Sequence, residues 1–471
     1  MNKERRYNAG VILTGCVVLS ALLCYGQIRD SGLLLWGCFA LFFLLALWSC
    51  YSGAVLVVLL FFLPWSPLVK ASYDGISFFT VALLAACIIS FVQNWRIINT
   101  YQTIAAIFLT ILTMAEKIYQ GNPIQSDYLA FLIMLLFFPC VMEKKEHASF
   151  REMTLFFAVG IISAALVAKQ AANFPNISRY IRVDSYLSIT RSAGFYGDPN
   201  FYSAHITACL AGVLILLTKE TRRLQQMVLV IVAVVLVYCG LLSASKSFIL
   251  VTICLAVAWI PTMLGQKTTV SSKFRLTLWI VCAACIILSS TMFDSLLEVV
   301  RERFSYSANI SQLTTGRTEI WKEYLREFSQ NIPLALFGNG YTSVTLNGRA
   351  SHNTIIQCIY QFGVVGTMLY VLWLVLVLRR MHQAMGKDKV HCEYAVLLGI
   401  GVVMPWMALD ILFFDEAFLL TAYAAMGSMM PERHADSDGF MENAEHGEED
   451  SKCTFLSPGE PDTSAPTQSS N

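Results

Sequence analysis

Long apolar blocks separated by short polar stretches make up the first 430 residues of the chain. A helix needs roughly 20 apolar residues to cross about 30 Å of bilayer hydrocarbon. Backbone groups in lipid must be paired within their own segment, so blocks of this length predict helices. The pattern predicts an all-α, polytopic membrane helix bundle of about fourteen spans, within a range of twelve to fourteen. The expected spans lie near 9–26, 32–51, 53–69, 76–93, 101–115, 128–142, 152–170, 200–217, 225–242, 247–264, 275–292, 353–378, 394–410 and 412–430.

Composition supports this class of protein and excludes a soluble one. The chain is 56% hydrophobic and 14% charged, whereas soluble domains carry roughly 25% charged residues. Its mean hydropathy is +0.59. A net charge of +1 gives no reason to expect nucleic acid as a partner.

Basic residues in the short loops predict the orientation of the spans, because Lys and Arg concentrate on the cytoplasmic side. Placing both termini in the cytoplasm puts seventeen basic residues in cytoplasmic segments: Lys3, Arg5, Arg6, Arg96, Lys144, Lys145, Arg151, Lys219, Arg222, Arg223, Lys267, Lys273, Arg275, Arg379, Arg380, Lys387 and Lys389. The short outer loops then hold four, which are Arg29, Lys70, Lys117 and Lys246.

Two long outer loops, 171–199 and 293–352, are also basic. The first carries Arg179, Arg182 and Arg191, and the second carries Arg301, Arg303, Arg317, Lys322, Arg326 and Arg349. Basic residues on the translocated side oppose the insertion bias, which favours a functional reason for them. Long loops also cross a membrane largely regardless of charge, so a neutral explanation stays open. We expect a membrane domain over 1–430, with a site formed by these two loops, and a disordered acidic cytoplasmic tail over 431–471.

The first candidate cluster, Arg191–Asn200, precedes the span that begins near 200. Gly194 permits tight backbone geometry, and Asp198-Pro199-Asn200 is a helix-start signal with Pro in the first turn. Free N–H groups at that helix start, with Arg191 beside them, would bind an anion. Taken alone, the segment fits an ordinary Gly/Pro loop better.

The second cluster, Thr314–Phe328, predicts an amphipathic helix inside the larger outer loop. Ile320, Trp321, Tyr324, Leu325 and Phe328 fall on one stripe, with charged residues opposite. Such a helix lies at the membrane surface or packs on the bundle. Arg317, after Gly316, falls in its first turn, where the helix dipole disfavours a cation. A bound anion would offset that cost, and the planar fork of Arg suits a phosphate.

The third cluster combines Leu336–Tyr341 with Ser351-His352-Asn353 before the next span. Of the seven histidines, only His352 falls in an outer loop. A lone histidine is more often structural than catalytic, but a neutral imidazole here could take a proton from an attacking sugar hydroxyl. Gly363 and Gly366 in the following span suit close helix packing.

Cysteine usage gives no sign of a metal site or a disulfide framework. Most of the fourteen cysteines lie inside apolar blocks, where a free thiol behaves as a small hydrophobe. We expect neither a metal nor a cofactor.

The three clusters together resemble the O-antigen ligase and O-antigen polymerase superfamily of bacterial envelope enzymes. The matching motifs are R-x-x-G-x-x-x-D-P-N at 191–200, G-R at 316–317 with Trp321 four residues beyond the Arg, F-G-x-G at 337–340, H-N at 352–353 and G-x-x-G at 363–366. Order and spacing agree from about 185 to 370. The N-terminal spans match only in being apolar.

This resemblance implies a metal-independent, inverting glycosyltransferase of surface polysaccharide biosynthesis in the cytoplasmic membrane of a bacterium. Its donor would be an oligosaccharide on undecaprenyl diphosphate, its acceptor a glycan or lipid, and its site open to the outer face and to membrane lipid. Arg191 and Arg317 would hold the donor diphosphate, and His352 would be the catalytic base. Supporting residues would be Gly194, Asp198, Asn200, Gly316, Trp321 and Asn353. Polymerase is preferred over ligase.

The chain departs from the family pattern at Ser243–Ser247, where members often have Ser-Arg. Lys246 would still supply a cation to the diphosphate, but as a point charge without the bidentate fork.

Two other classes of function remain open. A transporter of a small anion or a lipid-linked sugar explains the spans and the outer arginines, but not a sixty-residue outer loop. It also predicts ionisable residues near the bilayer midplane, and few exist before Asp410. A non-catalytic assembly protein leaves His352 unexplained.

The orientation can be tested with single cysteine probes and an impermeant thiol reagent applied from outside. Probes in place of Ser185 and Ile310 should be modified, and a probe in place of Phe440 should not. Labelling at position 440 would contradict an even number of spans with both termini inside.

Overall fold

The computed structural model describes residues 7–70, 75–94, 100–142, 148–181, 183–186, 189–265, 270–288, 297–298, 301, 314–341, 345–384, 391–412 and 415–430. The tail expected over 431–471 lies outside these residues, as does most of 293–313.

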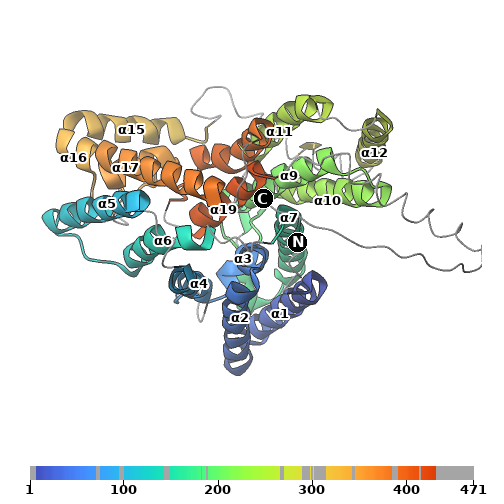
Figure 1. Cartoon of the computed structure of the whole chain (residues 1–471), viewed down its shortest axis with the longest axis horizontal. Coiled ribbons are helices and arrows are strands. Elements are labelled where there is room, and N and C mark those ends of the chain that lie inside the picture. Colours follow the sequence, from blue (N-terminus) through green and yellow to red (C-terminus); the bar gives the residue numbers. More distant parts are fainter. Residues whose placement is uncertain are drawn as a thin grey trace, which may run out of the picture. The chain divides into compact units, whose positions relative to one another are not determined.

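The described part of the chain is a bundle of helices (Figure 1). The first half contains α1 (Ala9–Arg29), α2 (Gly32–Ser52), α3 (Val55–Phe62), the 3₁₀ helix η1 (Leu63–Leu68), α4 (Phe78–Asn94), α5 (Thr100–Tyr119), α6 (Ser126–Met142), α7 (Phe150–Ala171), α8 (Pro175–Ser178), α9 (Pro199–Lys219) and α10 (Arg223–Leu242). The second half contains α11 (Lys246–Gly265), α12 (Val270–Leu288), α15 (Arg317–Gln330), α16 (Ile332–Phe337), α17 (Thr354–Ala384), α18 (Cys392–Leu398), the π-helical segment η3 (Gly399–Val403), the 3₁₀ helix η4 (Met404–Ala408) and α19 (Asp415–Ser428). A single antiparallel hairpin of β1 (Val183–Tyr186) and β2 (Ile189–Ser192) is the only sheet among the described residues.

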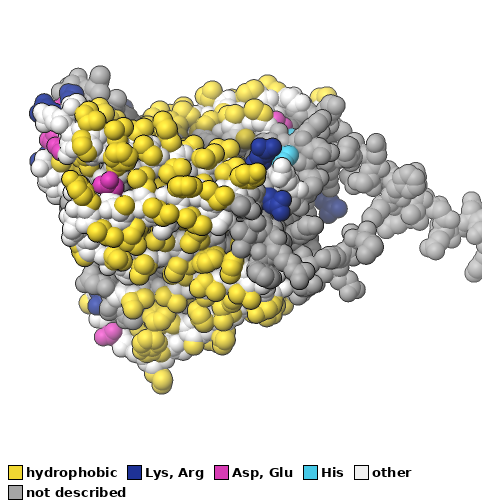
Figure 2. All heavy atoms as spheres, turned by 60° about the vertical axis from the view of Figure 1, so that its left-hand side comes forward, with side chains coloured by type: hydrophobic (Ala, Val, Ile, Leu, Met, Phe, Trp, Pro, Cys, Tyr) yellow, Lys and Arg dark blue, Asp and Glu magenta, His cyan; other side chains and the backbone are white. Residues whose placement is uncertain are grey.

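Length and hydropathy identify a multi-pass membrane protein with an all-α bundle. Within the described ranges, seven helices of at least 18 residues are apolar enough to cross a membrane: α1, α2, α7, α9, α10, α11 and α17. Four more apolar helices are shorter, over Val55–Leu68, Phe78–Gln93, Ser126–Met142 and Cys392–Ala408. Hydrophobic side chains cover most of the face seen in Figure 2, as expected for contact with lipid. The number of about fourteen crossings stays a prediction.

Two short helices, α3 and α19, form the centre of the bundle. Every residue of α3 is buried, and α19 is buried on nearly all sides. A helix that is apolar all round belongs in a core. The interruption near Asp410, Asp415 and Glu416 that the sequence shows therefore marks the start of an internal helix, which lies among its neighbours in Figure 1.

A break at Gly363 shapes the long helix α17. Gly363 has φ 66° and ψ 178°, so the helical hydrogen-bond ladder is interrupted there. The freed carbonyl of Gln361 accepts hydrogen bonds from the N–H groups of Gly340 (3.0 Å) and Tyr341 (3.2 Å). A Cβ on Gly338 would lie 2.4 Å from the backbone nitrogen of Gly363, so both positions require glycine. Gly363 allows close helix packing, as expected, because a Cβ there would lie 2.2 Å from the carbonyl oxygen of Leu336 in α16. The interruption of α17 at the same residue was not expected.

The same loop is fastened to α5 on its other side. The ammonium group of Lys117, which is buried, donates to the carbonyl of Tyr341 (2.7 Å). A Cβ on Gly340 would lie 2.3 Å from the backbone nitrogen of Lys117. Gly366 packs against Leu109 and Leu112 of α5, as close helix packing predicts.

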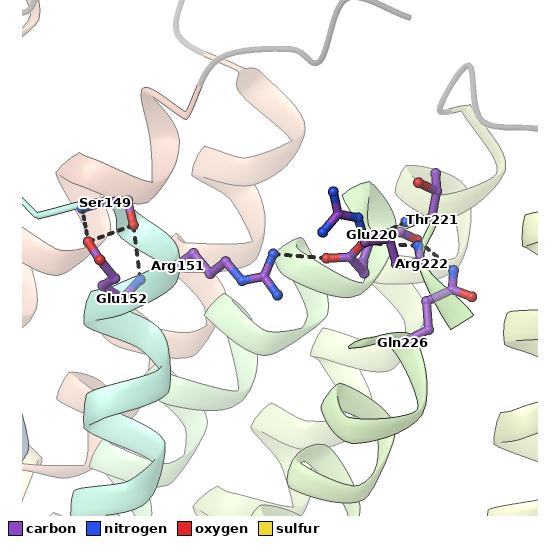
Figure 3. Close-up of polar contacts among 7 residues, drawn as sticks. All are labelled: Ser149, Arg151, Glu152, Glu220, Thr221, Arg222 and Gln226. Atoms are coloured by element: carbon purple, nitrogen blue, oxygen red, sulfur yellow. Dashed lines mark hydrogen bonds and ion pairs between the residues drawn. The ribbon is translucent and has the colours of Figure 1, made fainter. Parts of the chain in front are cut away.

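A polar network joins α7, α9 and α10 at the end of α9 opposite Pro199, about 30 Å away at 1.5 Å per residue (Figure 3). Arg151 pairs with Glu220 at 3.0 Å, and the Glu220 carboxylate accepts a hydrogen bond from the N–H of Arg222 at the start of α10. Ser149 and Glu152 form a capping box on α7. These contacts fix the far end of α9, whose first residues line the cavity described below.

The glycine contact can be tested by comparing Gly338→Ala with Gly348→Ala. Both residues have positive φ (78° and 73°), but no atom lies within 4 Å of a Cβ on Gly348. Gly348→Ala should cost only the left-handed conformation, roughly 1–2 kcal/mol. Gly338→Ala should cost about 1–3 kcal/mol more, for the clash and for its ψ of −165°, in a region essentially restricted to glycine. Thermal midpoints of the detergent-purified variants measure the difference. Equal midpoints would contradict the close backbone contact.

Candidate functional site

A cavity of about 770 Å³ lies where four helices begin. Pro199, Lys246 and Arg317 are the first residues of α9, α11 and α15, and all three line it, as does His352 just before α17. Backbone N–H groups at helix starts carry partial positive charge and bind anions. A volume of this size suits a small-molecule site.

The cavity brings together most of the residues that the sequence singles out. Arg191, Asp198, Asn200, Lys246, Arg317, Trp321 and His352 all line it. Gly194, Gly316 and Asn353 do not, although each is a neighbour of a lining segment. Segments that are 160 residues apart in the chain, from Arg191 to His352, therefore share one space.

The first motif fixes Arg191 and the start of α9. Arg191 pairs across the hairpin with Asp184, and its Nε donates to the carbonyl of Ser243 (3.1 Å). Asp198 caps α9 by accepting from the N–H of Asn200 (2.7 Å). Gly194 has φ 57°, and a Cβ there would lie 3.0 Å from the ring of Tyr202, so this glycine lets the chain pass over α9.

The Ser243–Ser247 segment follows α10, leads into α11 and contacts the start of α9. The Ser245 hydroxyl donates to the Asn200 side-chain carbonyl (2.8 Å). Lys246 follows directly as the first residue of α11. Lys246 is thus held at the cavity wall.

Arg317 is the lining residue whose charge would gain most from a bound anion. Gly316 precedes α15 with φ 80° and gives no side-chain cap. Among the described residues, no hydrogen bond or ion pair involves the Arg317 guanidinium. Burial lowers the pKa of Arg317, and the carboxylates of Asp198 and Asp410 oppose that shift. A guanidinium nevertheless stays charged in proteins, so this cation faces the cavity.

The amphipathic helix α15 packs on the bundle and holds the segment before His352. Tyr324 packs in a small cluster with Leu334 of α16 and Tyr360 of α17. The Trp321 indole donates to the carbonyl of Ser351 (2.9 Å), and the Tyr324 hydroxyl donates to the carbonyl of Arg349 (2.8 Å). Burial raises the pKa of Tyr324 to about 12, so this hydroxyl remains a donor.

His352 has a left-handed backbone, with φ 48°. Such a conformation is uncommon for a residue with a side chain and occurs where the surroundings impose it. Asn353 next to it caps α17, because its side-chain carbonyl accepts from the N–H groups of Ile355 (3.0 Å) and Ile356 (3.3 Å).

Asp410 is a residue of this region that the sequence reasoning missed. Its carboxylate accepts hydrogen bonds from the N–H of His352 (2.9 Å), the N–H of Asn353 (3.0 Å) and the hydroxyl of Ser351. The sequence presents Asp410 only as a charge that interrupts a weak span. Nothing in its spacing connects it to a segment 58 residues earlier, so only the folded chain identifies the partner.

A second missed feature is a buried pair in the bundle. His205 Nε2 of α9 lies 3.8 Å from Glu416 Oε1 of α19, and both side chains are almost fully buried. The Tyr196 ring packs on His205 at 4.6 Å between centroids. The sequence reasoning assigned His205 to a span and gave it no partner.

Metal-binding residues do not gather in the described part of the chain, where no group of three or more His, Cys, Asp or Glu could hold an ion. Cys282 and Cys285 have the C-x-x-C spacing of many metal and redox sites. Both are exposed on α12 with no further ligand in such a group.

Comparison with known proteins adds no assignment. No family model matches the chain, and no curated protein matches it.

The cavity is suited to bind an anion that has an apolar part. Arg191, Lys246 and Arg317 contribute cations, against one lining carboxylate, Asp198. The apolar part of the lining consists of Ile249, Leu250, Val251 and Ile253 of α11 with Met404 and Met407 of η4. Leu250 and Ile253 are more than half exposed, so this apolar lining is accessible to a ligand.

Binding of inorganic diphosphate to the purified protein tests the cationic side. Arg317→Lys should weaken binding by on the order of tenfold, because the charge remains but the bidentate hydrogen bonds of the fork are lost. Arg349→Lys is the control, since Arg349 does not line the cavity and lies 3.7 Å from Glu323. Isothermal titration gives both affinities. Unchanged binding in Arg317→Lys would contradict a bidentate contact.

Proposed function

We propose that this protein transfers or polymerises glycans carried on undecaprenyl diphosphate, in surface polysaccharide biosynthesis at the outer face of a bacterial cytoplasmic membrane. The observation that carries the proposal is the single cavity lined by Arg191, Lys246, Arg317 and His352. A donor of this class has a diphosphate for the cationic side and a prenyl chain for the apolar lining. The proposal includes about fourteen crossings, with both termini and the tail in the cytoplasm.

The proposed reaction is one inverting displacement. The oxygen of an acceptor hydroxyl attacks the anomeric carbon of the donor sugar, while the bond from that carbon to the diphosphate oxygen breaks. The hydroxyl proton passes to the neutral imidazole of His352, and the bonding electron pair leaves with the undecaprenyl diphosphate. Arg191, Arg317, Lys246 and the surrounding helix starts stabilise the charge that develops on the leaving group.

Polymerase is preferred over ligase, so the acceptor is a second glycan of the same kind, with a lipid acceptor as the alternative. The direct test is incubation of the purified protein with an undecaprenyl-diphosphate-linked oligosaccharide and a chelator. Chain elongation that persists with the chelator supports a metal-independent polymerase. Transfer only to an added lipid acceptor supports a ligase.

Transport is the second candidate, and one observation favours it. A transporter is expected to have ionisable residues inside the bundle, and the sequence shows few before Asp410. The buried His205–Glu416 pair supplies such residues. Vesicles that contain the protein distinguish the two functions: a transporter moves an unaltered labelled substrate across the membrane, and a transferase changes its covalent structure.

His352 gives the sharpest test of the chemistry. General-base assistance contributes roughly 10²–10⁴ in rate, so His352→Ala should lower turnover by that order and retain donor binding. The variant loses the proton acceptor, whereas Arg191, Lys246 and Arg317 remain to bind the donor.

Retention of the wild-type rate in His352→Ala would contradict the assignment. The base would then be one of the outer-loop carboxylates, Asp198, Asp294, Glu298, Glu302 or Glu319, or a phosphate of the donor itself.

A further inference from the structure

An extended segment, Leu409–Leu412, separates η4 from the internal helix α19. Leu409, Ile411 and Leu412 are buried, so the backbone of this segment has little access to water. The start of α17 supplies its partners. The Thr354 hydroxyl donates to the carbonyl of Leu409 (2.7 Å), and the side-chain carbonyl of Gln357 accepts from the N–H of Leu412 (3.3 Å).

The side chain of Asp410, within this segment, also accepts hydrogen bonds from the residues just before α17. One carboxylate oxygen accepts from the N–H of His352, and the other accepts from the N–H of Asn353 and the hydroxyl of Ser351. Three consecutive residues thus converge on one side chain. Hydrogen bonds to an ionised carboxylate are stronger than neutral ones.

The backbone of His352 needs such a restraint. At φ 48° it is in the left-handed region, which is unfavourable for a residue with a side chain and persists only when the surroundings fix it. Asp410 does not line the cavity, whereas His352 does. Asp410 therefore acts on the cavity only through the residue that it holds, and through its charge.

We propose that Asp410 is a positioning residue, whose carboxylate clamps the backbone of Ser351–Asn353 so that His352 faces the acceptor hydroxyl in the cavity. This inference rests on the proposed glycosyl transfer. Its electrostatic part concerns Arg317, because Asp410 is one of the two carboxylates that act on that guanidinium.

The clamp requires two acceptor oxygens, so its test compares a variant that loses one oxygen with a variant that keeps both. In Asp410→Asn, one oxygen is replaced by an NH₂ group that cannot accept from a backbone N–H. Turnover at saturating donor should fall on the order of 10²-fold, the cost of misplacing a reacting group by about 1 Å. Donor KM should stay equal or decrease, because the cavity loses a negative neighbour. Asp410→Glu keeps both oxygens and should recover part of the turnover.

Asp415→Asn is the matched control. Asp415 is a partly buried carboxylate at the start of α19 that accepts a hydrogen bond from the Thr80 hydroxyl (2.7 Å) and does not line the cavity. If loss of a carboxylate here only impairs folding, both variants should lose the same fraction of active protein with unchanged donor KM. Equal losses in the two variants, or turnover of Asp410→Asn within twofold of the wild type, would overturn the positioning role.

Hydrogen exchange tests the clamp without relying on activity. The amides of His352 and Asn353 should be protected in the wild type and exchange faster in Asp410→Asn, while the amides of α15 remain unchanged. Unaltered exchange at 352 and 353 would overturn the clamp. A wild-type protein that shows the protected amides but transfers no glycan would refute the proposed function, and with it the role of the clamp in transfer, while the hydrogen bonds themselves would stand.

Discussion

A backbone group buried in an apolar bundle must find a hydrogen-bond partner within the protein, and this constraint determines where the chain can leave the helical conformation. It does so at Gly338–Tyr341, at Gly363 and at Leu409–Leu412. In each place a specific group completes the bond: the carbonyl of Gln361, the side chains of Thr354 and Gln357, or the carboxylate of Asp410. Irregular segments of this kind are tolerated in membrane proteins where they are enclosed by protein or line a cavity. Here they surround the residues that line one.

The cavity depends on a second consequence of the same constraint. Four helices begin around it, so their N–H groups and the side chains of Arg191, Lys246 and Arg317 concentrate positive charge in one space. Such a concentration is unfavourable without an anion. Two carboxylates reduce the repulsion: Asp198, which caps α9, and Asp410, which binds the backbone before α17. Both carboxylates that reduce the repulsion between the cations are thus also hydrogen-bonded to the backbone.

Much of this arrangement could be predicted from the sequence, and particular residues show why the rest could not. Apolar blocks predict the helices, because membrane segments follow composition closely. The motifs around Arg191, Arg317 and His352 gave residues that do share a cavity. Gly363 packs against a neighbouring helix as expected, but the break it makes in α17 could not be predicted, since a G-x-x-G spacing has the same letters with or without such a break. Asp410 and Glu416 have partners 58 and 211 residues away, and no local pattern indicates contacts at such separations.

The length of α19 has a consequence for the depth of the cavity. This helix has 14 residues, or about 21 Å, and its far end meets the start of α18 through the hydrogen bond from His391 N–H to the Ser428 carbonyl (3.0 Å). The hydrocarbon layer is about 30 Å thick. If that far end lies at one membrane boundary and α19 runs along the membrane normal, its start at Asp415 lies below the other boundary. An ionised ligand at this depth would sit partway down the electrical potential across the membrane, where each charge is worth about 2.3 kcal/mol per 100 mV over the full thickness. Occupancy of the cavity would then depend on the voltage that the cell maintains, as well as on the ligand's concentration.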